Sequence, residues 1–152
     1  MKISFDLDDT IVPGNKSFTT EHQTPFQKLL GIEPIRIGTI KLFKELKRRN
    51  HEIGIYTTSF RSFFRIKFLF LSNGFVVNFI INQKSHSRKL NEENIQCSKY
   101  PPAFNIDLHI DDSIGVEIEG QKYGFETIIV DEREPDWVNL ILKRSELMKI
   151  VK

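Results

Sequence analysis

The sequence predicts an α/β fold, a three-layer, Rossmann-like parallel sheet flanked by helices. Short apolar segments of strand length alternate with longer segments in which apolar residues recur at helical spacing. This alternation is typical of parallel sheets, because each helix returns the chain to the start of the next strand. A length of 152 residues, with 39% hydrophobic and 28% charged residues, suits one domain with its own core. We therefore expect a single domain over residues 1–152.

The expected strands are short and are bounded by polar or turn-forming residues. They cover residues 3–5, 52–56, 76–81, 106–110 and 126–130. Asp107 and His109 interrupt the fourth apolar run, but its length and its position in the alternation still favour a strand.

The expected helices fill the intervals between these strands. Residues 34–50 fit an amphipathic helix with apolar residues near helical spacing and a basic last turn, which favours the helix dipole. Ser59 is expected to cap a helix that continues to Leu71 and ends before Gly74. Further helices are expected at residues 113–123 and 136–150.

Two polar segments are harder to assign. Residues 12–33 are expected to form a loop with one short helical piece at residues 25–30. Residues 82–99 are expected to be helical only near residues 89–93.

Acids and hydroxyls follow three of the expected strands. Parallel strands joined by right-handed crossovers bring their carboxyl ends to one edge of the sheet, where ligands bind. The residues concerned are Asp6, Asp8 and Thr10; Thr57, Thr58 and Ser59; and Asp111, Asp112 and Ser113. On an extended backbone Asp6 and Asp8 would point the same way and repel each other, unless a cation lies between them. Mg²⁺ is the expected ion, since it prefers carboxylate and phosphate oxygens.

Three motifs in this order resemble those of a known superfamily. F-D-L-D-D-T-I resembles the D-x-D-x-T motif of the haloacid dehalogenase-like (HAD) phosphotransferases. I-G-I-Y-T-T-S is similar to the second motif, and D-L-H-I-D-D-S to the fourth. The resemblance implies a Mg²⁺-dependent phosphomonoester hydrolase that acts on a phosphorylated substrate.

The resemblance also implies roles for individual residues. Asp6 would be the nucleophile that forms an aspartyl-phosphate, and Asp8 would carry the proton. Thr57 would bind the phosphoryl group, with Thr58 beside it. Mg²⁺ would be held by Asp6, the backbone carbonyl of Asp8 and Asp112, with Asp111 in a water-mediated or indirect role.

The third motif of the superfamily is a lysine that neutralises the nucleophile. Lys99 is the favoured candidate, because its Ser-Lys-Tyr-Pro-Pro setting can fix its direction. Lys89 is the second candidate and Lys84 the third. Lys89 is also expected to bind substrate, within a basic rim that Arg61 and Arg65 would extend.

The gaps between the motifs are too short for a full cap domain, so we expect an open crevice. Such a crevice admits small or macromolecular phosphorylated substrates. The loops at residues 12–33 and 82–98, or another subunit, are the candidate covers. The alternative function is a non-catalytic phosphate- or protein-binding module on the same fold.

Composition sets further expectations. A single cysteine, Cys97, excludes an intramolecular disulfide and suits a reducing compartment, so a cytoplasmic location is expected. A formal charge of +2 does not indicate nucleic acid as a partner, and we expect no membrane partner. The apolar-rich residues 60–70 are interrupted by three cations and cannot span a bilayer. His86 and His109 are expected at the surface or the rim, and Asp9 is expected to make structural hydrogen bonds.

Overall fold

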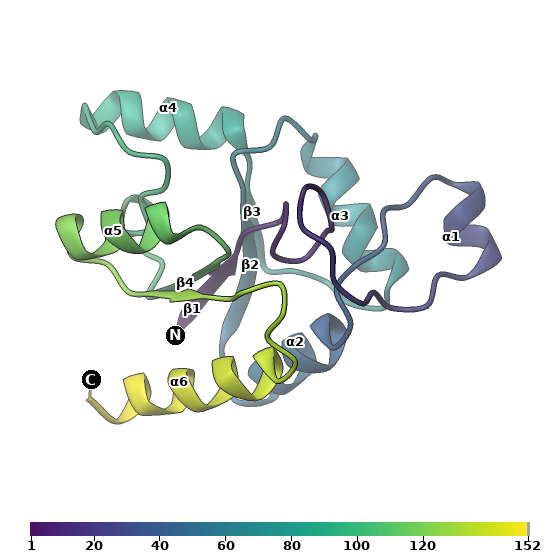
Figure 1. The fold of residues 1–152 in the computed structure, drawn as a ribbon. Helices are drawn as coiled ribbons and strands as arrows, with labels where there is room; N and C mark the ends of the chain where they lie inside the picture. The colour runs from purple at the N-terminus through teal and green to yellow at the C-terminus, as the bar shows by residue number, and fades with distance from the viewer. Residues whose placement is uncertain (152) are drawn as a thin grey trace.

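A computed structural model describes the backbone of residues 1–151 and the side chains of residues 1–148. Its centre is an all-parallel sheet of five strands in the order β3-β2-β1-β4-β5 (Figure 1). The strands are β1 (Lys2–Phe5), β2 (Glu52–Tyr56), β3 (Phe79–Ile81), β4 (Leu108–Asp111) and β5 (Thr127–Ile129). This arrangement, with helices on both faces, is consistent with the expected Rossmann-like α/β fold.

Helices cover both faces of the sheet (Figure 1). They are α1 (Pro25–Leu29), α2 (Thr39–Arg48), α3 (Phe63–Ser72), α4 (Gln83–Glu93), α5 (Ile114–Tyr123), α6 (Trp137–Val151) and the 3-10 turn η1 (Pro101–Phe104). α2, α3 and α6 lie on one face, and α4 and α5 on the other, as right-handed crossovers require.

The main core lies between the sheet and the layer formed by α2, α3 and α6. Phe43 of α2 is at its centre, with ring centroids 4.7 Å from Phe5, 5.6 Å from Phe70 and 5.3 Å from Phe75. Aromatic rings at such separations add to the stabilisation that area burial alone provides. These packed side chains hold the strands, and so the residues at the strand ends, in fixed positions.

Two helix starts differ from expectation. α2 begins at Thr39 rather than at residue 34, because the preceding residues are extended and the Arg36 N–H donates to the Ile11 carbonyl (2.7 Å). Gly38, with φ of 87°, then turns the chain into the helix. Ser59 was the expected cap of α3, but Ser62 is the residue whose hydroxyl accepts from the Arg65 N–H.

Other bounds differ by a few residues. α4 is longer than expected, because Asn82 caps it by accepting from the Ser85 N–H. β3 starts three residues later than expected, and β4 runs one residue further, to Asp111. The short α1 is present as predicted. No helix in the part of the chain that the structure describes is long and apolar enough to cross a membrane.

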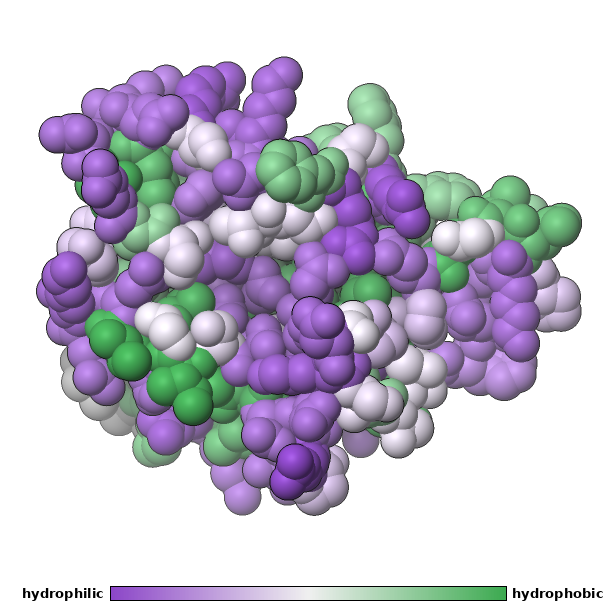
Figure 2. Space-filling model, turned by 45° about the horizontal axis from the view of Figure 1, so that its top comes forward, coloured by the Kyte–Doolittle hydropathy of each residue, from purple (hydrophilic) through white to green (hydrophobic). Residues whose placement is uncertain are grey.

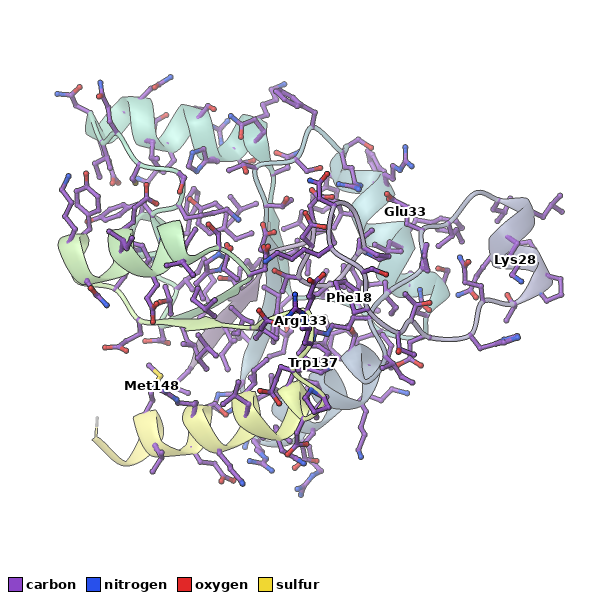
Figure 3. The ribbon with its side chains drawn as sticks, viewed as in Figure 1. Phe18, Lys28, Glu33, Arg133, Trp137 and Met148 are labelled. Carbon is purple, nitrogen blue, oxygen red and sulfur yellow. The ribbon has the colours of Figure 1, made fainter. Side chains whose placement is uncertain are left out.

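Several contacts tie the long segment between β1 and α2 to the rest of the fold, among them one at Arg36 and one at Gln27. The buried Arg36 guanidinium lies 4.8 Å from the ring of Phe18 and 4.9 Å from that of Trp137, and donates to the Asp131 carbonyl at 2.8 Å. Figure 3 labels both aromatic residues. At the other point Gln27 of α1 donates to the Ser72 carbonyl (3.0 Å), so that α1 projects from the side of the molecule beside the end of α3 (Figure 1).

Candidate functional site

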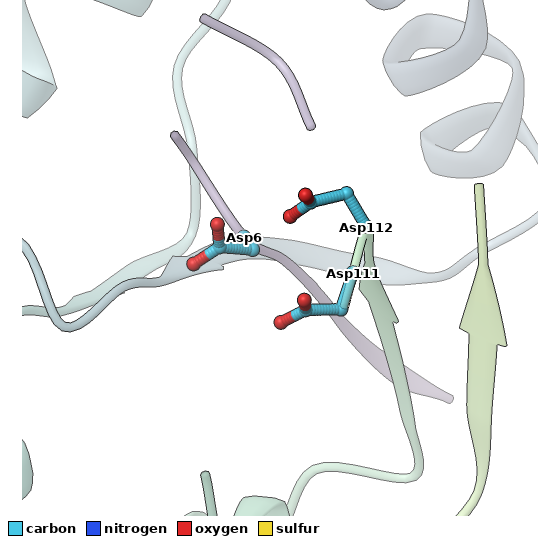
Figure 4. Close-up of side chains that lie close together, drawn as sticks. All are labelled: Asp6, Asp111 and Asp112. Atoms are coloured by element: carbon cyan, nitrogen blue, oxygen red, sulfur yellow. The ribbon is translucent and has the colours of Figure 1, made fainter. Parts of the chain in front are cut away.

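The strand order reverses direction between β1 and β4, and a cluster of acids lies at that point. The chain proceeds from β1 to β2 and β3 on one side, then returns to β4 on the other side of β1. Phe5 pairs with Ile110, so Asp6 at the end of β1 lies beside Asp111. Ligand oxygens of Asp6, Asp111 and Asp112 lie within 4.8 Å of one another (Figure 4). The carboxyl edge at such a switch point is where open α/β sheets bind ligands.

Lys99 supplies the positive charge of this cluster. Its buried ammonium donates to Asp6 and to the Tyr56 carbonyl (2.9 Å), and lies 3.5 Å from Asp111 Oδ2. Glu119 of α5 holds the loop, since it accepts from the backbone N–H groups of Ser98 (2.8 Å) and Lys99 (3.2 Å). No local pattern in the sequence points to this role of Glu119.

The two other candidate lysines lie elsewhere on α4. Lys89 is half-buried and pairs with Glu93 at 2.8 Å, one helical turn away. Lys84 is exposed. The structure therefore brings Lys99, the favoured candidate, into contact with Asp6, and it places Lys89 outside the cavity where Asp6 lies.

The two neighbouring carboxyls, Asp6 and Asp111, have opposite pKa shifts. Burial raises the pKa of Asp6 to about 7; the charge of Lys99 opposes the rise and that of Asp111 adds to it. Burial also acts to raise the pKa of Asp111, but the hydrogen bond and charge of His109, with the charge of Lys99, outweigh it and lower that pKa. The cluster thus favours a cation, because a bound cation would stabilise the ionised form of Asp6.

Asp112 is held at the open side of the cluster by two residues of the β1–α2 segment. The Thr10 hydroxyl donates to Asp112 Oδ1 (3.2 Å), and the Lys16 ammonium lies 2.7 Å from Oδ2. Asp9, with φ of 62°, shapes this segment by accepting from the Gly14 N–H (2.9 Å) and the Lys16 N–H (2.8 Å). The structural role predicted for Asp9 is confirmed, whereas the contact of Lys16 had no signal in the sequence.

Asp8 does not share the cluster with Asp6, contrary to the expectation that the two carboxylates point the same way. β1 ends at Phe5, and the chain turns immediately after it, so the side-chain alternation of a strand does not extend to Asp8. The Asp8 carboxylate is instead bound by Arg61 at 2.6 Å, and the same guanidinium binds Glu33 at 2.7 Å. The proposed bond from the Asp8 backbone carbonyl to Mg²⁺ stays a prediction.

The residues that follow β2 lie on the other side of Asp6. Thr57 is buried, and its hydroxyl oxygen accepts from the Ser59 N–H (3.1 Å). Thr58 is exposed and lines a cavity of about 210 Å³ together with Asp6, Lys99, Asp111 and Asp112. Of the two threonines, Thr58 is thus placed on the cavity wall.

The expectation that His86 and His109 lie at the surface is wrong. His109 is fully buried, because β4 is an inner strand of a parallel sheet that is covered on both faces. Its Nε2 donates to Asp111 (3.0 Å), so its Nδ1 accepts from the Ser4 hydroxyl (2.8 Å). His86 is also buried, and its Nδ1 lies 2.7 Å from the Tyr56 hydroxyl. Burial lowers the pKa of both imidazoles.

No family model matches the chain, and neither a curated protein nor a solved structure matches it. The likeness to the HAD superfamily therefore rests on the three motifs and on where they lie in the fold.

Proposed function

We propose that the protein is a Mg²⁺-dependent phosphomonoester hydrolase of the HAD type, with Asp6 as the nucleophile. The observation that supports this most is the contact of Lys99 with Asp6 beside Asp111 and Asp112, at the switch point of the sheet. A buried carboxylate held by one ammonium, next to further acids and a cavity, has the parts that covalent phosphoryl transfer needs.

The donor set suits a hard divalent cation. The carboxylates of Asp6, Asp111 and Asp112 offer oxygen ligands, which Mg²⁺ prefers. Asp111 already accepts from the Ser113 N–H (2.9 Å) and from His109 (3.0 Å), so Asp6 and Asp112 are the better direct ligands. When bound, the ion would reduce the repulsion between the carboxylate and an anionic substrate.

The residues of this chain would then act in two steps, the formation of an aspartyl-phosphate and its hydrolysis. An Asp6 carboxylate oxygen attacks phosphorus, the bond to the leaving oxygen breaks, and Asp8, in its protonated form and released from Arg61, gives that oxygen its proton. Asp8 next takes a proton from water, whose oxygen attacks phosphorus and releases inorganic phosphate and free Asp6. Lys99 fixes the direction of Asp6, and the Thr58 hydroxyl would hold a phosphoryl oxygen, since the Thr57 N–H already donates to the Ile81 carbonyl (2.9 Å).

The test compares hydrolysis of an aryl phosphate by the wild type and by Asp6→Asn in the presence of Mg²⁺. We expect a loss of turnover of at least about a thousandfold, because the amide of Asn cannot form the aspartyl-phosphate. Asp136→Asn, at an exposed acid remote from the cluster, is the matched control and should keep full activity. Equal turnover by Asp6→Asn and the wild type would exclude the mechanism.

One observation favours a second candidate, a non-catalytic phosphate- or protein-binding module. Lys16 and Lys99 already neutralise part of the acid cluster, and Arg61 occupies Asp8. No turnover across a panel of phosphomonoesters, combined with retained binding of inorganic phosphate, would support this alternative.

A further inference from the structure

The surface over α1, the loop before α3 and the outer side of α3 is apolar and exposed. We call its six largest side chains the apolar face: Phe26, Leu29, Phe60, Phe63, Phe64 and Phe68. Phe60 is 93% exposed, Leu29 83% and Phe64 78%, so these side chains project from the surface. In Figure 2 apolar groups lie at the right, over α1, and at the top, with hydrophilic groups between them. Large exposed apolar patches on soluble proteins mark interaction surfaces.

α3 has more apolar side chains than the sheet can bury. Ile66, Leu69 and Phe70 fill the core, while Phe64 and Phe68 face outward, where a surface helix normally has polar residues. A groove of about 320 Å³ lies between α3 and the segment that follows α1, and its walls include Leu30, Ile32 and Phe68. One side chain of the apolar face, Phe68, thus lines this groove.

The segment that carries α3 and continues into α4 has charge of a single sign. Residues 53–91 contain six Lys and Arg residues and no Asp or Glu. Arg65, Lys67, Lys84 and Arg88 are exposed. The acid of the adjoining segment, Glu33, is turned inward to Arg61 at 2.7 Å and to Arg65 at 3.6 Å. The net charge of the whole chain is small, so it does not reveal that positive charge is concentrated in this segment.

We propose that the apolar face docks the protein onto an anionic membrane surface. Phe and Leu side chains would enter the boundary between headgroups and acyl chains, and the surrounding Lys and Arg would bind anionic headgroups. This is charge complementarity between a basic surface and an anionic bilayer. It revises the expectation of no membrane partner, which rested on net charge and on the absence of a spanning segment. The proposal uses no residue of the acid cluster and so stands apart from the proposed hydrolase activity.

Two other occupants fit the surface less well. In a symmetric contact with a second copy the same basic surface would face itself, and like charges would oppose each other. Single-stranded nucleic acid could stack on Phe60 and Phe64, but Leu29 offers no aromatic face for a base. An anionic bilayer accommodates both the aliphatic and the aromatic side chains.

The experiment is co-sedimentation of the full chain with vesicles of phosphatidylcholine, with and without phosphatidylserine. We expect binding only when phosphatidylserine is present. Phe60→Ser with Phe64→Ser should weaken it at least about tenfold. Lys67→Gln with Arg88→Gln should weaken it about fivefold for each cation removed, and added salt should weaken it as well.

The matched controls remove the same kinds of side chain at positions outside the apolar face. Ile118→Ser with Leu147→Ser removes two exposed apolar side chains, and Lys143→Gln with Arg144→Gln removes two exposed cations of α6. Both controls should bind like the wild type, and thermal unfolding of every variant verifies its fold. Three outcomes would overturn the proposal: no binding to phosphatidylserine vesicles, equal losses in controls and test variants, or binding of an oligonucleotide but not of vesicles.

Discussion

The two halves of the candidate site are built in different ways. The inner half consists of Asp6, Lys99 and Asp111, which are nearly fully buried, with side chains 3–11% exposed. The outer half consists of Asp8, Arg61 and Glu33, with side chains 19–43% exposed. Strand pairing positions both acids of the inner half, whereas the outer half depends on long side chains that meet across loops.

The difference in burial means that electrostatic interactions are strong in the inner half and weak in the outer half. Charges in a buried cluster interact strongly, and an unpaired one is costly. Partly exposed pairs are screened by water and contribute little to stability. Substitutions in the inner half should therefore change stability and its pH dependence, while those in the outer half should chiefly free the β1–α2 segment.

The largest effect is expected for Lys99→Met, which leaves Asp6 and Asp111 without their shared cation. We expect a loss of about 3 kcal/mol in the free energy of unfolding at pH above neutrality. The pKa of Asp6 is 3.8 when unfolded and about 7 when folded, so the folded protein binds the extra proton between those values and its stability falls as pH rises. Removing Lys99 raises this pKa further, so the loss should grow with pH. Urea unfolding at a series of pH values measures it.

The matched control is Lys89→Met, which removes the ammonium of a half-buried pair on α4. It should destabilise the protein much less than Lys99→Met does, and show no comparable trend with pH. Equal losses for the two variants would contradict the contrast between the buried cluster and the partly exposed pairs.

A smaller effect is expected for Arg61→Gln, which separates Glu33 from Asp8. The cost in unfolding free energy should be about 1 kcal/mol, because water screens both ion pairs. The β1–α2 segment would lose one attachment, so trypsin should cleave faster after Lys28, an exposed residue of α1 (Figure 3). Arg48→Gln, which removes an exposed pair with Glu45, is the control. An unchanged cleavage rate in Arg61→Gln would show that other contacts hold the segment.

The same contrast explains what the sequence could predict. Polar residues at strand ends located Asp6, Asp111 and Asp112, because parallel topology alone brings strand ends together. The alternation of segments also gave the five strands, and the bounds of β2 were predicted without error. Buried His109 could have been found, since a strand between two others in a covered parallel sheet has no exposed face.

Loop contacts could not be predicted in this way. The pairing of Asp8 with Arg61 depends on the turn that follows β1, and no local pattern specifies which distant side chain will meet it. The late start of α2 has a similar cause. The Arg36 N–H donates to the Ile11 carbonyl, and its guanidinium packs against Phe18 and Trp137. Tertiary contacts there override an apolar spacing that favours a helix.

The smallest effect is expected where the β1–α2 segment meets the buried acids, at Lys16. Burial alone would lower the pKa of Lys16, but the hydrogen bond and charge of Asp112 raise it, so the ammonium stays charged beside the cluster. If Asp112 binds Mg²⁺ as proposed, a cation entering there competes with Lys16. Lys16→Gln should therefore tighten Mg²⁺ binding by about 1 kcal/mol, or about fivefold, in calorimetric titration. Lys28→Gln should leave the affinity unchanged, and weaker binding by Lys16→Gln would mean that Lys16 orients Asp112 rather than competing for it.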